Sequence, residues 1–353
     1  MNIDKIFKNK KVIITGHTGF KGSWLTLWLS EIGAKVLGIS KNIPTNPSHY
    51  KLLNLEKKIQ SKKIDIQDFR KVNKIIKQFK PDFIFHLAAQ SIVKKSYKDT
   101  IETWKTNLLG TINILESLKE SKKQTVTIII TSDKCYKNFE TKRGYDENDI
   151  LGGEDPYGAS KSAAEIAINS YVKSFFNSKK NKNVIVSTRA GNVIGGGDWT
   201  DNRLLPDCIK SWNNRKIVKI RNLNSTRPWQ HVLDVVYGYL LLGVKAKINN
   251  KLHGESFNFG PDMKNNYKVL DVLKESKSFW KNVKWQKDKK IIFKENTLLN
   301  LNNNKSKRIL KWKPILNFRN TIKLTIEWYK CYHLKKKMIL KSINQIKYYK
   351  NLI

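Results

Sequence analysis

The chain has 353 residues, of which 40% are hydrophobic, so it can bury a core of its own and is not a disordered chain. Its 68 Lys and Arg against 29 Asp and Glu give a formal net charge of +39. Such a field attracts polyanions, but the lysines are spread along the whole chain, so we expect solvated surface lysines and no nucleic-acid partner. Three scattered cysteines without CxxC spacing argue against a disulfide framework or a zinc site, and we expect no metal.

The apolar runs are short. The N-terminus reaches only Val12 to Thr15 before it turns glycine-rich, which is too short for a secretory signal. The longest apolar run, Val235 to Val244, is about half of what spans a bilayer. We therefore expect a cytoplasmic protein with no membrane partner.

Strand-like apolar runs alternate with amphipathic stretches over the first two thirds of the chain. The expected strands are Lys11–Thr15, Lys35–Ile39, Phe83–Ala88, Thr127–Ser132, Val184–Thr188 and Ser256–Phe259. The expected helices lie near 20–32, 68–79, 101–120 and 157–176. Nearly continuous apolar strands that alternate with helices are typical of a parallel sheet covered on both faces. The sequence therefore predicts a doubly wound parallel α/β sheet of the Rossmann type.

The pattern changes from about Gly191. The sequence predicts a glycine-rich loop at 195–199, a helix near 203–214, a short strand pair near 217–222, a helix near 231–246, an amphipathic helix from about Phe318 to Leu334 and a frayed Lys-rich end. We expect a dinucleotide-binding domain of residues 1–190 and 231–261. Residues 191–230 and 262–353 are expected to form a smaller, mainly C-terminal lobe that binds the substrate.

The first expected strand runs directly into a glycine-rich turn, Gly16 to Gly22, with GxxGxxG spacing. Gly16 allows a tight turn, Gly19 lets the backbone approach a pyrophosphate, and Gly22 lets the following helix pack on the strand. Backbone N–H groups at the helix N-terminus then hold the diphosphate. The second strand lacks the usual terminal acid, which leaves NAD and NADP open. Ser40 is the candidate ribose contact, and Asp65 is either an adenine contact or a helix cap.

Tyr157 and Lys161 form a YxxxK pair on a helix that follows Asp155-Pro156. Positions i and i+4 share one helical face, so the phenol and the ammonium project together. A cationic Lys161 and a nicotinamide cation favour the phenolate, so we expect the pKa of Tyr157 to be lowered and Tyr157 to act as a base. Ser132, at the end of the fourth strand, completes a Ser-Tyr-Lys set that orients a substrate hydroxyl.

Six segments resemble those of CDP-glucose 4,6-dehydratases, which belong to the extended short-chain dehydrogenase/reductase (NAD-dependent epimerase/dehydratase) family. They are GHTGFKGSW (16–24), HLAAQ (86–90), TSDKCY (131–136), DPYGASK (155–161), STRAGNVIGGGDW (187–199) and STRPWQHVLDV (225–235). The resemblance implies that CDP-glucose loses water through transient hydride transfer to bound NAD. Tyr157 would take the proton of O4, and Asp133 would protonate the departing O6. Lys134 would be the C5 base, which we favour, or a stabiliser of the enolate.

The resemblance and the same residue logic also assign binding residues. Expected cofactor contacts are Gly16, Thr18, Gly19, Phe20, Gly22, Ser40, Asp65, Ile66, Leu87, Ala88, Ala89, Asn107, Tyr157 and Lys161. Expected substrate contacts are Gln90, Ser132, Asn192, Arg203, Arg227 and His231. Asn107 is also expected to brace the sheet. The two arginines suit pyrophosphate oxygens because guanidinium groups bind them in a fork, whereas His231 is equally well explained as a residue that starts a helix.

Two other functions share parts of this pattern. A nucleotide-sugar 4-epimerase or reductase would use the same Tyr157 and Lys161, but it needs no acid such as Asp133 to expel O6. A non-catalytic regulator that binds nucleic acid would use the positive charge, but no binding motif supports it. From the resemblance we also expect a homodimer formed through the helices near 101–120 and 157–176, and a product used for the deoxysugars of a surface polysaccharide such as lipopolysaccharide.

Overall fold

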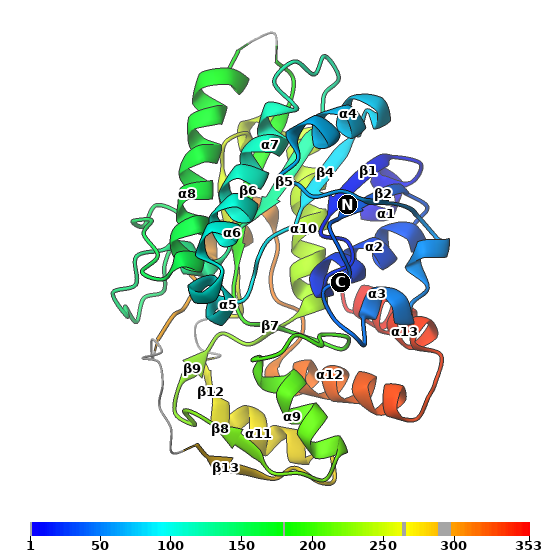
Figure 1. Cartoon of the computed structure of the whole chain (residues 1–353), viewed down its shortest axis with the longest axis vertical. Coiled ribbons are helices and arrows are strands. Elements are labelled where there is room, and N and C mark those ends of the chain that lie inside the picture. The colour runs from blue at the N-terminus through cyan, green and yellow to red at the C-terminus, as the bar shows by residue number, and fades with distance from the viewer. Residues whose placement is uncertain (1, 179–180, 263–265, 289–297) are drawn as a thin grey trace.

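The computed structural model describes residues 2–178, 181–262, 266–288 and 298–353. A parallel sheet with helices on both faces forms its centre (Figure 1). The seven strands lie in the order β3-β2-β1-β4-β5-β6-β11. They span Lys11–Thr15 (β1), Lys35–Ser40 (β2), Gln60–Lys63 (β3), Phe83–His86 (β4), Val126–Ile130 (β5), Val184–Ala190 (β6) and Ser256–Phe259 (β11). Every neighbouring pair is parallel. The order reverses beside β1, as in dinucleotide-binding sheets, so the predicted fold is confirmed.

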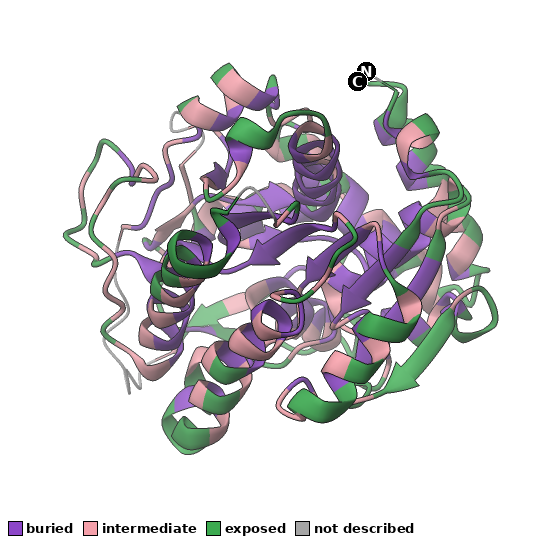
Figure 2. Cartoon of the chain, turned by 90° about the horizontal axis from the view of Figure 1, so that it is seen from above, coloured by how far each residue is buried: buried purple, intermediate pink, exposed green. Residues whose placement is uncertain are grey.

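Helices cover the two faces of the sheet. One face carries α1 (Ile3–Phe7), α2 (Phe20–Glu31) and α10 (Val232–Ile248), and the other carries α4 (Phe69–Phe79), α7 (Gly110–Glu116) and α8 (Pro156–Tyr171). Along β1, Val12 and Ile14 belong to the first core and Ile13 to the second, and all three are fully buried. Figure 2 shows the central strands buried between the two helical layers, which explains their continuous apolar sequence.

Two of the predicted helices contain a π-helical turn. The stretch near 101–120 consists of α6 (Thr100–Trp104), a π-helical turn at Lys105–Leu109 and α7, with α5 (Val93–Lys98) before it. The α8 helix continues into a π-helical turn at Val172–Phe176. Asp155 caps the N-terminus of α8 by accepting a hydrogen bond from the Gly158 N–H at 2.9 Å, and Pro156 occupies the first turn.

The remaining helices and short strand pairs lie mostly at one end of the molecule (Figure 1). The helices are α3 (His49–Leu52), beside α2, and α9 (Leu204–Asn213), α11 (Val269–Lys277) and α12 (Phe318–His333). The pairs are β7 (Val193–Ile194) with β10 (Gln230–His231), β8 (Val218–Ile220) with β13 (Trp285–Lys287), and β9 (Thr226–Arg227) with β12 (Tyr267–Lys268). The strand pair predicted near 217–222 is wrong, because so short a segment holds only β8, whose partner β13 is distant in sequence. Among the described residues, no helix has the length and apolar character needed to span a membrane.

The Lys-rich end forms a helix, α13 (Met338–Lys350), so the expectation that it frays is wrong. Tyr349 is fully buried, and its hydroxyl bonds to Asp234 Oδ1 at 2.8 Å. Lys350 pairs with Asp4, and the two chain ends lie side by side (Figure 2). The apolar face of α13 packs near α2. Burial of this face therefore outweighs the polar composition, and α13 packs against α2 and α12.

Candidate active site

The turn between β1 and α2 has the shape that a diphosphate site needs. Gly16 has a φ of +73°, and a Cβ at Gly22 would lie 2.1 Å from the carbonyl oxygen of Gly16. Neither position can therefore accept a side chain without a backbone shift. Gly19 is the N-cap residue of α2, and among the described residues no side chain caps this end. The first N–H groups of α2 are thus available to an anion, and these residues fit a dinucleotide.

The end of β2 lies beside this turn. The Ser40 hydroxyl hydrogen-bonds with His17 Nδ1 at 2.9 Å, and the Thr18 hydroxyl donates to the Asn42 carbonyl at 2.7 Å. Burial lowers the pKa of His17 to about 4, which leaves its ring neutral at pH 7. The predicted ribose contact at Ser40 is therefore adjacent to the phosphate loop, with a neutral imidazole next to it.

Asp65 follows β3 at the same edge of the sheet. Its carboxylate forms an ion pair with Lys41 at 2.8 Å and accepts a hydrogen bond from the Gln67 N–H at 3.0 Å. Asp68, rather than Asp65, caps α4, so the alternative role of Asp65 as that cap is wrong. Ile66 is buried, and its side chain occupies the space that a Cβ of Gly110 would need.

The loop after β4 approaches the glycine turn. A Cβ at Gly16 would lie 2.7 Å from the Ala88 nitrogen, so the Leu87-Ala88 backbone lies directly against this turn. Asn107 accepts a hydrogen bond from the Gln90 N–H at 2.8 Å, and its amide donates to Ser160 Oγ at 2.9 Å. Asn107 thus joins the β4 loop to α8, as the predicted brace.

The side chain of Gln90, which was predicted to contact the substrate, is engaged within its own loop. Its amide donates to the Ile92 carbonyl at 3.2 Å and to Thr103 Oγ1 at 3.0 Å. Its Oε1 accepts a hydrogen bond from the Ile92 N–H at 2.7 Å. These bonds position the loop and use both amide hydrogens, which leaves the second lone pair of Oε1 for a substrate contact.

Tyr157 and Lys161 are both buried on one face of α8, at the end of β5. Burial raises the pKa of Tyr157 to about 12, opposed by a hydrogen bond with Ser132. The Lys161 ammonium donates to the Ile130 carbonyl at 3.3 Å. The expected decrease in the pKa of Tyr157 is therefore wrong for the protein groups alone, because desolvation of the phenolate outweighs them.

Lys161 keeps most of its charge at neutral pH despite its burial. Burial lowers its pKa to about 8, and the negative charge of Glu165 acts in the opposite direction. The cationic Lys161 that the sequence predicts is thus compatible with the site. Glu165 lies one helical turn further along α8.

Asp133 faces the interior, whereas Lys134 lies at the rim. The Asp133 side chain accepts a hydrogen bond from the Ser132 hydroxyl at 2.9 Å, and the residue is 4% exposed. A Cβ at Gly191 would lie 1.8 Å from its Oδ2, so the carboxyl fills the space of the missing side chain. The Lys134 side chain is 38% exposed, with Nζ 3.5 Å from Asp155 Oδ2.

The structure brings some of the predicted substrate residues to this centre. Arg203 forms an ion pair with buried Asp198 at 3.1 Å and is near enough to Tyr157 to oppose the rise of its pKa. Asn192 connects β6 to β7 with a φ of +41°. Arg227, in β9, is half-buried, and its guanidinium donates to the Thr226 carbonyl at 2.8 Å.

His231 is fully buried at the start of α10. Its Nδ1 accepts a hydrogen bond from the Leu233 N–H at 3.2 Å and so caps the helix. Burial lowers the pKa of His231 to about 3, which keeps the ring neutral. This geometry fits the alternative of a helix-start residue rather than a substrate contact.

Lys21 belongs to the same cluster and was missed in the sequence. It lies inside the glycine turn, and its Nζ is 3.5 Å from the Tyr239 hydroxyl. Burial lowers the pKa of Lys21 to about 8, with Arg203 and Lys161 acting in the same direction and Asp133 against them. A lysine between the second and third glycines of the turn was the signal that could have pointed to this position.

The glycines at 195–197 also have a packing role that the loop prediction did not give. A Cβ at Gly196 would lie 2.0 Å from the Trp328 ring, and one at Gly197, where φ is +84°, 2.4 Å from His49. Trp24 of α2 donates its ring N–H to the Gly196 carbonyl at 2.9 Å. Close aromatic packing thus joins this loop to α2 and α12.

The doubly wound sheet, the glycine turn and the buried Ser-Tyr-Lys set define an enzyme of the extended short-chain dehydrogenase/reductase class. The sequence model of the family described as "GDP-mannose 4,6 dehydratase" matches residues 13–325. The chain belongs to this family of nucleotide-sugar dehydratases. It is 40% identical to a CDP-glucose 4,6-dehydratase of Salmonella typhimurium, over 98% of both chains, which confirms the resemblance found in the sequence.

One more distant relative and two solved structures are also similar, and the solved structures share the fold. The dTDP-glucose 4,6-dehydratase of Haemophilus influenzae is 25% identical, over 90% of this chain and 97% of its own. An epimerase of Methanothermobacter thermautotrophicus has the same fold, with a TM-score of 0.81, 24% identity and coverage of 95% and 96%. A dTDP-glucose 4,6-dehydratase of Bacillus anthracis, solved in complex with NAD, has a TM-score of 0.74, 20% identity and coverage of 94% and 99%.

Proposed function

We propose that this protein removes water from CDP-glucose to give CDP-4-keto-6-deoxyglucose, with NAD as its cofactor. The substrate is supported by the 40% identity to a CDP-glucose 4,6-dehydratase along nearly the whole chain. The dehydratase reaction is supported by one observation above all. Asp133 is buried against Gly191, beside Ser132 and Tyr157. An epimerase has no use for an acid at this place, because it does not expel O6.

The cofactor would lie on the glycine turn, with Ser40 and the Leu87–Ala89 backbone beside it. A bound NAD would supply the hydride acceptor for C4 and the hydride donor for C6 of the sugar, and its positive charge would favour the Tyr157 phenolate. Ser132 hydrogen-bonds the O4 hydroxyl, and Tyr157 takes its proton as the 4-ketone forms. Lys161 stabilises the phenolate through its charge.

Elimination is then the task of Asp133 and Lys134. The 4-ketone makes the C5 hydrogen acidic, and that proton leaves to a base as Asp133 donates its own proton to O6, which departs as water. Lys134 reaches the sugar from the rim, either as the C5 base once it leaves Asp155 or as a cation beside the enolate. Addition of the hydride at C6 and of a proton at C5 completes the product, with the net loss of one water.

Arg203 is the strongest candidate for the diphosphate of the substrate. Its guanidinium is half-buried, it lies close to Tyr157, and Asp198 fixes its direction through an ion pair at 3.1 Å. Residues 191–230 and the part of 262–353 that precedes α13 would then form the lobe that covers the sugar nucleotide. We expect Arg203→Met to raise the KM for CDP-glucose more than it lowers kcat, and steady-state kinetics measure both.

Incubation with CDP-glucose and NAD, followed by alkali, tests the proposed function directly. The expected 4-keto-6-deoxy product gives a new ultraviolet absorbance in alkali, and mass spectrometry shows the loss of one water. Appearance of CDP-galactose without that absorbance would instead identify a 4-epimerase. A panel of CDP-, dTDP-, GDP- and UDP-glucose under the same conditions tests the choice of base.

We also propose that the protein forms a homodimer through α6, α7 and α8. Apolar side chains lie exposed on these helices, among them Ile101 (72% exposed) and Ile166 (60% exposed), and Leu109 and Phe175 are exposed in the π-helical turns of the same helices. Burial of such side chains against a second copy is favourable. Sedimentation is expected to show a dimer for the wild type and a monomer for Ile166→Glu. Leu334→Glu, at an equally exposed site near the end of α12, serves as the control, and a wild-type monomer would contradict the proposal.

A further inference from the structure

One face of α8 carries a third buried polar residue, Glu165, one helical turn after Lys161. Tyr157, Lys161 and Glu165 are spaced by four residues, which places them in one stripe along the helix. The Glu165 side chain is 3% exposed and forms an ion pair at 2.9 Å with Arg189 of β6, whose side chain is 4% exposed. The mechanism above uses neither of these two charges.

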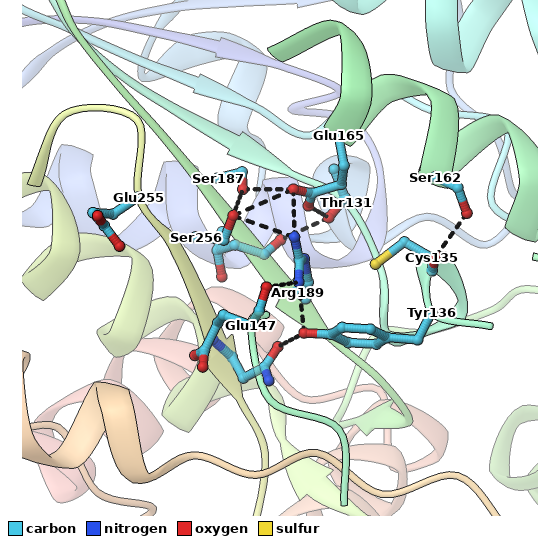
Figure 3. A network of polar contacts seen from close by, with 12 residues as sticks. Thr131, Cys135, Tyr136, Glu147, Ser162, Glu165, Ser187, Arg189, Glu255 and Ser256 are labelled. Carbon is cyan, nitrogen blue, oxygen red and sulfur yellow. Dashed lines mark hydrogen bonds and ion pairs between the residues drawn. The ribbon is translucent and has the colours of Figure 1, made fainter. Parts of the chain in front are cut away.

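Figure 3 shows what the carboxylate of Glu165 contacts. Its Oε1 accepts a hydrogen bond from the Thr131 hydroxyl, and its Oε2 accepts hydrogen bonds from Ser187 and Arg189, each at 2.9 Å. Burial acts to raise the pKa of Glu165, but Arg189 and the hydroxyl donors outweigh it and hold the pKa below its usual value. Glu165 is therefore a carboxylate that accepts from all its partners.

Arg189, the other member of the ion pair, contacts Tyr136, which lies in the same segment as Thr131. Arg189 donates to the Tyr136 hydroxyl at 2.7 Å and to the Glu147 carbonyl at 3.1 Å, and its guanidinium lies 4.8 Å from the Tyr136 ring centre (Figure 3). The Tyr136 hydroxyl in turn donates to Asn258 Oδ1 at 2.9 Å. Residues 131–136, here called the acid segment, are thus held at their first residue by Glu165 and at their last by Arg189.

We propose that the buried Glu165–Arg189 pair is a positioning device for the elimination step. It fixes both ends of the acid segment, so that Asp133 between them keeps its carboxyl against Gly191 and beside Tyr157. Since the segment's chemistry is that of the dehydratase, this proposal rests on the proposed function. A single helix, α8, would then orient both halves of the reaction: Tyr157 and Lys161 for the oxidation at C4, and Glu165 for the loss of water.

Stability alone is a weak reason for such a pair. Taking two charges out of water costs as much as their attraction returns, and apolar residues of similar volume often replace a buried pair without loss. Ordering of a functional segment is a use that apolar residues cannot serve, because they offer no directed hydrogen bonds. Ser162, also on α8, adds a third tie by donating to the Cys135 carbonyl at 2.7 Å. The ties converge on the segment that carries Asp133.

The variants are chosen to release the segment without leaving a buried charge unpaired. Removal of Glu165 or Arg189 itself would leave an uncompensated buried charge and would test folding rather than positioning. Thr131→Val removes the hydrogen bond at the first end, and Tyr136→Phe removes the one at the last end, while the ion pair stays. Ser187→Ala is the matched control. It also removes one hydroxyl group that donates a hydrogen bond to Glu165, but Ser187 lies outside the acid segment.

Two measurements follow. In the protein without substrate, hydrogen–deuterium exchange of the peptide that covers residues 131–136 is expected to be faster in Thr131→Val and Tyr136→Phe than in the wild type and Ser187→Ala. With CDP-glucose and NAD, the first two variants are expected to lose about 10- to 100-fold in turnover, since misplacement of a reacting group by about 1 Å costs up to that much. Their reduced nicotinamide, seen by its absorbance, should accumulate because elimination has become slow.

The outcomes separate this proposal from the function it rests on. Wild-type exchange and wild-type turnover in both Thr131→Val and Tyr136→Phe would overturn the positioning role while the dehydratase stands. The same loss in Ser187→Ala would overturn it as well, since that variant leaves the segment held. A wild-type enzyme that makes no dehydrated product overturns the proposed function, and with it the assignment of an elimination step to this segment.

Discussion

The variant Asp133→Asn is expected to turn over CDP-glucose about 100- to 10 000-fold more slowly than the wild type, the range by which general acids contribute. The amide has the shape of the carboxyl, so it still fits against Gly191 and still accepts the Ser132 hydrogen bond. It cannot, however, give a proton to O6. Oxidation at C4 does not require Asp133, so the reduced nicotinamide should form and persist. Stopped-flow absorbance and product analysis measure the two halves separately.

Two further observations decide whether Asp133 is the acid. Asp201→Asn is the control, because the Asp201 side chain is 79% exposed and pairs only with Lys210 among the contacts that the structure describes; its turnover should equal that of the wild type. The thermal midpoint of Asp133→Asn should stay close to the wild-type value. Normal turnover by a folded Asp133→Asn would exclude an acid role, and the dehydratase would need another proton donor.

Local patterns were sufficient to predict the fold. The β1 strand was readable because Val12, Ile13 and Ile14 are apolar in succession, as a strand buried on both faces requires, and a glycine-rich turn follows directly. The glycine turn was readable because its spacing is a local property of the backbone. The errors arose where partners are distant in sequence: β8 pairs with β13, and α13 is held by a contact from Tyr349 to Asp234.

The site was predicted in its residue types but not in its electrostatics. The sequence placed Tyr157, Lys161, Ser132 and Asp133 together because β5 and α8 are neighbours in the doubly wound order. It gave the wrong direction for the pKa of Tyr157, because the cost of desolvation depends on how deeply the phenol is buried, which no motif encodes. The tie between Glu165 and Thr131 joins α8 to the end of β5, and such a contact is visible only in three dimensions.

Tyr157→Phe is expected to stop the reaction at its first half, unlike Asp133→Asn. Phenylalanine keeps the packing of the ring but removes the hydroxyl that takes the O4 proton in the proposed reaction, so neither the reduced nicotinamide nor the product should form above about one-hundredth to one ten-thousandth of the wild-type rate. Below the pKa of Tyr157, which burial raises to about 12, the phenolate fraction increases with pH. The wild-type oxidation rate should therefore rise with pH while Lys161 stays charged, and the residual rate of Tyr157→Phe should lack this dependence.

Tyr171→Phe is the matched control, because Tyr171 is also on α8 but bonds to Glu116 at 2.9 Å, away from the acid segment. Burial lowers the pKa of Lys161 to about 8, so the rise of the oxidation rate should flatten above that pH as the ammonium loses its proton and no longer favours the phenolate. A pH profile of single-turnover oxidation distinguishes these cases. If Tyr157→Phe reduced the nicotinamide at the wild-type rate with the same pH profile, another base would act at O4. The assignment of Tyr157 on α8 to the oxidation and of Asp133 after β5 to the elimination would then be wrong.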